Sequence, residues 1–298
     1  MGRLRTTYVT LAIVITSISL GMLFLKLDQL PPIIEWWPES SESIDLAIAT
    51  LFAVFQITIA SLIFHSSARG NNENKKRLIA VFLLAQAGKY APGRIWSPFI
   101  QKFVLGEHIG ISGIFLANII VFGCVLFSQI LTAMVTLVYF YSGVIFATIA
   151  AALGLFVPNA ILIFLASTSL TKKWIFIDEL SKISRRIELL RNIGLLFLSG
   201  ILTWAFFYIG WLKYSVDEGI ALIGTTSVSV IAGYFSLLPA GLGVREAMFI
   251  AMKDFAWPLP YEHMPQLAIQ SRTFLFLVDA LTAVLGLLLL LFSSKSKS

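Results

Sequence analysis

The sequence predicts an all-α protein that crosses a membrane several times. Of its 298 residues, 58% are hydrophobic and 13% are charged, and the mean hydropathy is +0.87. Soluble domains carry about 25% charged residues. Residues 109–171 contain no charged side chain and no histidine, and a helical span needs roughly 20 apolar residues. Such runs are too long and too continuously apolar for barrel strands, so the spans are expected to be helices.

The first half of the chain contains three predicted spans, at residues 8–27, 44–64 and 109–138. The loop at 28–45 carries five acidic and no basic side chains, whereas the loop at 69–77 carries four basic ones. Because basic residues collect in cytoplasmic loops, the N-terminus and the second of these loops are expected in the cytoplasm.

The second half contains three more predicted spans, at residues 144–170, 192–212 and 271–292. The basic stretch at 172–191 is a candidate amphipathic helix on the cytoplasmic face. Two lysines near the C-terminus follow the last span. Both termini are therefore expected in the cytoplasm, with the protein in the inner (cytoplasmic) membrane of the cell.

Between the second and third spans, the pattern of residues 78–105 does not predict a straight helix. Their centre, AGKYAPGRIW at residues 87–96, sets the helix breakers Pro92 and Gly93 among charges. Proline removes a helical hydrogen bond and glycine weakens the helix. We expect two half-helices with a turn between them, forming a re-entrant hairpin that enters from the cytoplasm.

A second broken segment covers residues 219–257. Its centre is LLPAGLGVREAM at 237–248, where Pro239, Gly241 and Gly243 precede an Arg–Glu pair. We expect a second re-entrant hairpin, entered from outside. Paired broken helices in the two halves of a membrane chain are typical of a site at the bilayer midplane.

The order of these segments predicts an inverted repeat within a single transmembrane domain, residues 1–298. Each half, about 1–142 and 143–298, has two spans, a hairpin and a third span. Because three spans per half is an odd number, the second half is inverted relative to the first. An alternative with about eight full spans fits the distribution of loop charges nearly as well.

The Arg–Glu pair of the second hairpin is the first candidate for chemistry. A helix is expected to begin near Val244, and its N-terminus together with Arg245 makes an anion site. Glu246 can hold the arginine or accept a proton. The competing interpretation is a kink whose Arg–Glu pair satisfies itself, but charges at membrane depth are usually functional.

The first hairpin offers Lys89 and Arg94 on either side of its break, with Tyr90 and Trp96 able to stack or hydrogen-bond. Arginine and lysine side chains bind phosphate. The alternative for this group is simple anchoring at the cytoplasmic interface.

In the last span, Arg272 and Asp279 are seven residues apart and therefore share one helix face. Asp279 can pair with Arg245 or Lys89, or relay protons. The alternative is a structural pair between helices. Polar residues inside other spans are more often interhelical hydrogen bonds than ligands. They are Gln56, Asn118 and Gln129.

Several classes of function are disfavoured. The chain shows no metal-ligand cluster, phosphate-binding loop or hydrolase motif, so no metal and no cofactor are expected. The net charge of +6 is attributed to membrane orientation and anionic headgroups rather than to nucleic acid. Almost no residues remain for a soluble catalytic domain, so the protein is not expected to be an enzyme.

Both central motifs resemble those of a known family. GKYAPGRIW and LPAGLGVREA are similar to the signatures of the transmembrane, flippase-type region of lysylphosphatidylglycerol synthases, which also occurs next to glycosyltransferases that use polyprenyl-linked sugars. Ala240 replaces a glycine of the usual motif, and the chain has no C-terminal acyltransferase-like domain, so it is not expected to transfer lysine. The matching residues are Gly88, Lys89, Tyr90, Pro92, Gly93, Arg94, Trp96, Pro239, Gly241, Gly243, Arg245 and Glu246.

The resemblance implies a lipid flippase, whose cargo is a modified phospholipid or a polyprenyl-phosphate sugar. One alternative is a membrane-embedded lipid-phosphate transferase with Glu246 or Asp279 as base. Another is a non-catalytic lipid-binding partner of a separate synthase or glycosyltransferase. A transporter of small anions is a fourth possibility, and an oligomer is compatible with all of them.

Overall fold

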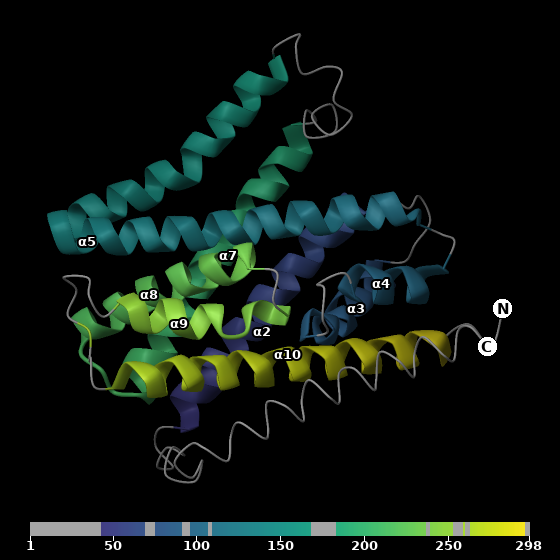
Figure 1. Ribbon diagram of the computed structural model, residues 1–298. Helices are drawn as coiled ribbons and strands as arrows, with labels where there is room; N and C mark the ends of the chain where they lie inside the picture. Colours follow the sequence, from purple (N-terminus) through teal and green to yellow (C-terminus); the bar gives the residue numbers. More distant parts are fainter. Residues whose placement is uncertain are drawn as a thin grey trace.

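The described part of the chain is helical and contains no strand (Figure 1). This computed structural model describes residues 43–68, 75–90, 96–106, 109–167, 183–236, 239–252, 259 and 263–295. In chain order, the described helices are α2 (Ser43–Ser67), α3 (Lys75–Leu84), η2 (Ala85–Tyr90), α4 (Trp96–Leu105), α5 (Ile111–Ser167), α7 (Ile183–Ala205), η4 (Phe206–Trp211), α8 (Val216–Phe235), η5 (Pro239–Gly241), α9 (Val244–Ala251) and α10 (Met264–Lys295).

Several expectations lie outside the described residues. They concern the first span at 8–27, the turn residues Pro92 and Gly93 together with Arg94, and most of the basic stretch at 172–191.

The chain is a membrane protein by the length and composition of its helices. Among the described residues, five segments are long and apolar enough to cross a bilayer: Ser43–Ser67, Ile111–Gly154, Arg191–Trp211, Val216–Phe235 and Met264–Phe292. Their outer faces expose large apolar side chains, and a continuous surface of that kind suits lipid rather than water.

One sharp bend joins the third and fourth predicted spans. The helix α5 continues through the expected outside turn at 139–142 and bends at Gly143, which has φ 82° and ψ 175°. Glycine adopts a positive φ without the clash that a side chain would cause. In Figure 1, α5 runs across the molecule and turns back at one end, so the two spans form a helical hairpin with almost no loop.

The first broken segment consists of two short helices that fold against each other. Both α3 and α4 have ten residues, or about 15 Å, which is half of the hydrocarbon thickness. The Ser97 hydroxyl donates to the Ala85 carbonyl at 2.7 Å. A Cβ on Gly88 would lie 2.9 Å from the backbone nitrogen of Ser97. The expectation of two half-helices is therefore met by α3 and α4.

The two helices of the second broken segment differ in length. Ser215 and Glu218 form a capping box that starts α8 at Val216, so α8 has 20 residues and is long enough to cross, whereas α9 has only eight. The helix therefore begins three residues before residue 219, where the second broken segment was expected to start. Between the helices, Ala240, Gly241 and Gly243 all have positive φ.

The broken segments lie between α5 and α10. Figure 1 shows α3 and α4 near one end of α10 and α8 and α9 near the other. The helix α3 packs on α10 and α8 packs on α5, while α2 packs on α7. The central elements η2 and η5 touch each other, so residues near 90 and near 240 meet inside the bundle.

Candidate functional site

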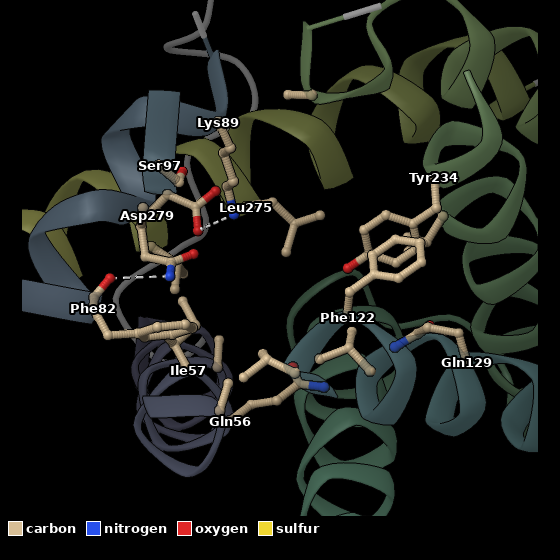
Figure 2. Close-up of a pocket in the computed structure, with 18 of the residues that line it drawn as sticks. Gln56, Ile57, Phe82, Lys89, Ser97, Phe122, Gln129, Tyr234, Leu275 and Asp279 are labelled. Carbon is tan, nitrogen blue, oxygen red and sulfur yellow. Dashed lines mark hydrogen bonds and ion pairs between the residues drawn. The ribbon is translucent and has the colours of Figure 1, made fainter. Parts of the chain in front are cut away.

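A cavity of about 380 Å³ lies where the two broken segments meet. Small-molecule sites span about 300–1,000 Å³, so the space suits a small ligand or a lipid headgroup. Residues from α2, α3, η2, α4, α5, α7, α8, η5, α9 and α10 line it. Figure 2 shows Lys89, Asp279 and Leu275 on one side, with Tyr234, Phe122 and Gln129 across the space.

An ion pair ties the first broken segment to the last helix. The Lys89 ammonium donates to Asp279 Oδ1 at 2.6 Å, and the Tyr90 hydroxyl donates to Oδ2 at 2.5 Å. Asp279 is only 3% exposed, and a buried carboxylate is tolerated when it is paired and hydrogen-bonded. Of the two partners predicted for Asp279, Arg245 and Lys89, the structure pairs it with Lys89.

The Arg245 side chain packs against the backbone of Gly233 and Gly241 on its way to the cavity. A Cβ on Gly233 would lie 2.4 Å from Arg245 Cγ and 2.5 Å from its Nε. A Cβ on Gly241 would lie 3.2 Å from the same Nε and 2.8 Å from Gly233 Cα. The guanidinium carbon lies 5.5 Å from the centre of the Tyr234 ring, a cation–π distance. Close packing and an aromatic ring therefore position this arginine.

Glu246 contacts Arg272 rather than its neighbour in sequence. The distance from Arg272 Nε to Glu246 Oε1 is 3.7 Å, and Glu246 Oε2 accepts a hydrogen bond from the Gly243 N–H at 2.7 Å. The carboxylate thus caps α9, which begins at Val244 as expected. One of the N–H groups freed by the break is therefore already satisfied within the chain.

The cavity wall is electropositive. Its described lining contains three cations, Lys89, Arg245 and Arg272, and one carboxylate, Asp279, so the net charge is 3 − 1 = +2. Glu246 lies just behind, beside a smaller cavity that shares both arginines. Arg245 Nε and Arg272 Nη2 are buried without a hydrogen-bond partner in the described part of the chain. Unsatisfied buried N–H groups of this kind favour an acceptor, and the charge favours an anion.

Five carboxamides line the remainder of the polar wall: Gln56, Gln86, Gln101, Asn118 and Gln129. Asn118 donates to Gln101 at 2.6 Å between α5 and α4, as expected for an interhelical bond. The Gln56 amide reaches the Leu196 carbonyl on α7 only at 3.4 Å. Gln129 Oε1 is buried without a partner among the described residues, so the interhelical interpretation does not account for it.

The structure brings together most of the residues singled out from the sequence. Lys89, Tyr90, Arg245, Arg272 and Asp279 line one cavity. Pro239, Gly241 and Gly243 form the tight turn that precedes α9. Trp96, the first residue of α4, is not among the described lining residues.

Sequence reasoning missed Gln86, Gln101, Ser97 and Tyr234. The first three lie in the short helices of the first hairpin, where polar residues look like parts of a turn. Tyr234 precedes the second break, and an aromatic residue just before a charged turn is the only signal that could have indicated it.

No group of three or more His, Cys, Asp or Glu side chains within the described ranges is arranged to hold a metal ion. None of the family models, curated proteins and solved structures compared with this chain matches it. Inference about function therefore depends on the cavity and its chemistry.

Proposed function

We propose that the protein is a translocase that moves a phosphate-bearing lipid between the leaflets of a membrane. The observation that carries the proposal is an electropositive cavity between helices long and apolar enough to cross a membrane, whose described lining holds three cations and one carboxylate that is already paired. Charges at this depth are costly and usually serve substrates or ions.

The phosphate of a lipid headgroup fits between the two arginines and the lysine. Arg245 and Arg272 each have a buried guanidinium N–H with no hydrogen-bond partner among the described residues, and guanidinium groups bind phosphate oxygens in pairs. Lys89 keeps 40% of its side-chain surface open, so its ammonium can share a phosphate oxygen while it stays on Asp279. The tails remain in the surrounding bilayer, against the apolar helix faces.

An inverted repeat would allow such a site to open to each side in turn. In this repeat, α2 corresponds to α7, the α3–η2–α4 segment to α8–η5–α9, and the first part of α5 to α10. If the two halves are exchanged, the contact between α3 and α10 becomes the contact between α8 and α5, and the contact between α4 and α5 becomes the contact between α9 and α10. The contacts between α2 and α7 and between η2 and η5 are unchanged by the exchange. All six of these contacts are present in the structure. This pattern supports a pseudo-twofold axis through the cavity.

The motif resemblance to the flippase-type region of lysylphosphatidylglycerol synthases supports the same function. It also supports a separate synthase or glycosyltransferase as a partner that supplies the lipid. The basic loop at 69–77 and the lysines near the C-terminus support a cytoplasmic-membrane location with both termini in the cytoplasm. The unequal lengths of α8 and α9 fit a hairpin in which one arm crosses the bilayer and the other does not.

The test is transport by purified protein in liposomes that contain a lipid with a fluorescent tail, measured by chemical quenching of the outer leaflet. Arg245→Ala and Arg272→Ala should each slow translocation by about 10- to 100-fold, because a hydrogen bond to a charged group is worth about 1.5–3 kcal/mol. Arg191→Ala is the matched control, since Arg191 is exposed on α7 outside the lining.

Wild-type rates in both cavity variants, with the proteins intact, would show that the site is wrong. Conversion of the lipid into a new chemical species, detected by mass spectrometry, would replace transport with a transferase reaction.

A further inference from the structure

We infer that the cavity selects a headgroup in which the phosphate is bonded to a neutral, hydroxyl-rich group, such as a sugar or glycerol, rather than to a cationic aminoacyl group. This inference rests on the proposed function and names the substrate class of the same site.

The cavity has two chemically different parts. Its charged part is formed by Lys89, Arg245, Arg272 and Asp279, and the carboxamides supply a neutral polar part. The carboxamides come from four separate elements: Gln56 on α2, Gln86 on η2, Gln101 on α4, and Asn118 and Gln129 on α5. Their convergence on one space is therefore a property of the fold and not of one helix.

Carboxamides are suited to hydroxyl groups, because each offers two N–H donors and an oxygen acceptor. The internal bonds use only part of this capacity. Asn118 donates to the Gln101 oxygen at 2.6 Å and to the Ile114 carbonyl at 2.8 Å, and the Gln101 amide donates back to Asn118 at 3.4 Å. The Gln86 amide donates to the Phe82 carbonyl at 3.2 Å, and the Gln56 amide donates to the Leu196 carbonyl at 3.4 Å. Each of the last two bonds uses one of the two N–H groups of its carboxamide.

Gln129 is the strongest indication of a missing partner. It is 7% exposed, it lines the cavity, and its Oε1 is buried without a hydrogen bond in the part of the chain that the structure describes. Figure 2 shows its side chain extending toward the cavity beside Phe122. A buried amide oxygen without a partner is unfavourable, and a ligand hydroxyl would satisfy it.

Aromatic side chains complete the neutral part. Phe122 and Tyr234 meet edge to face with ring centres 5.1 Å apart, and Trp204 also lines the cavity. Their apolar surfaces can cover the C–H groups of a sugar or glycerol while the amides bind its hydroxyls.

A cationic headgroup has no comparable partner. Asp279 is the only carboxylate among the described lining residues, and it already accepts hydrogen bonds from Lys89 and Tyr90. An aminoacyl ammonium would have to displace Lys89 and would also face two arginines. Like charges in a partly desolvated site repel strongly, which selects against that ligand.

The experiment compares lipids that differ only beyond the phosphate. Native mass spectrometry in detergent measures the binding of phosphatidylglycerol and of phosphatidylmethanol, which carry the same charge. A polyprenyl hexosyl phosphate and the methyl ester of the same polyprenyl phosphate form a second pair. Lysylphosphatidylglycerol is the cationic competitor. The two pairs distinguish a glycerol headgroup from a sugar.

In at least one pair the hydroxylated lipid should bind about tenfold tighter, the effect of one or two net hydrogen bonds. Lysylphosphatidylglycerol should bind more weakly than phosphatidylglycerol. Gln129→Leu should bring the preferred ratio close to one while the methyl esters still bind, which also shows that the variant is folded. Gln266→Leu, at an exposed position of α10, should leave the ratio unchanged.

Ratios near one in both pairs would overturn the inference, and so would an undiminished ratio in Gln129→Leu or tighter binding of the lysyl lipid. If those results occur while Arg245→Ala still weakens the binding of every phosphate lipid, the proposed function survives without the selectivity. If wild-type protein binds none of these lipids, the proposed function and this inference both fail.

Discussion

Replacing Gly233 by alanine tests the placement of Arg245 without touching the arginine itself. The added methyl carbon would lie 2.4 Å from Arg245 Cγ, 2.5 Å from Nε and 3.0 Å from Cδ. Carbon atoms in contact are about 3.5–4.0 Å apart, so the side chain must move by roughly 1 Å or more.

The variant separates function from stability. Within a helix, alanine is favoured over glycine by about 1 kcal/mol, so α8 itself should not be weakened. A displacement of 1 Å in a positioned group can lower a rate by about 100-fold. We therefore expect lipid translocation by Gly233→Ala to fall by about 10- to 100-fold, with a thermal unfolding temperature in detergent close to that of the wild type.

The assay is the liposome translocation measurement, combined with thermal unfolding of the same preparations. Gly194→Ala and Gly123→Ala are matched controls, because a Cβ at either position meets no atom of the described residues within 4 Å. Both controls should transport at the wild-type rate. A Gly233→Ala protein that also transports at that rate would refute the claim that Arg245 must occupy its observed position.

Three further variants test other contacts of the site. Asp279→Asn raises the net charge of the described lining from +2 to +3 and releases Lys89. Binding of a phosphate lipid, measured by native mass spectrometry, should therefore tighten about five- to tenfold. Weaker binding would contradict the assignment of this cavity as a phosphate site. Gly241→Ala places a side chain at φ 72° and 2.8 Å from Gly233 Cα, and it should lower the free energy of unfolding by about 1–3 kcal/mol; an unchanged denaturant midpoint would count against the tight turn. Glu246→Gln keeps an acceptor for the Gly243 N–H and should change the free energy of unfolding by less than about 1 kcal/mol, whereas Glu246→Ala loses the cap and should lower it by about 1–2 kcal/mol. Equal effects of the two variants would show that the ion pair between Glu246 and Arg272 stabilises the protein more than the cap does.

Long-range contacts mark the limit of what the sequence could predict. Hydrophobic runs identify spans such as 44–64 well, because a helix in lipid needs apolar residues on every side. The partner of Asp279 could be narrowed only to Arg245 or Lys89, since the choice depends on how η2 packs against α10, 190 residues apart. Charge alone does not distinguish two cations that converge on one carboxylate.

Element lengths and neutral polar contacts were harder to predict. The capping box at Ser215 lengthens α8 to 20 residues, which a search for apolar runs does not reveal. The cavity glutamines Gln86 and Gln101 share no spacing or motif. Their common surroundings arise only when α3, α4 and α5 pack together, so a sequence pattern cannot predict them.

The most direct test of the central claim is an electron cryomicroscopy map of the protein bound to a phosphate-bearing lipid. The account predicts density for the phosphate within hydrogen-bonding distance of the Arg245 and Arg272 guanidinium groups, with the Lys89 ammonium beside it. A lipid phosphate bound away from all three side chains, with the cavity between the broken segments unoccupied, would contradict it.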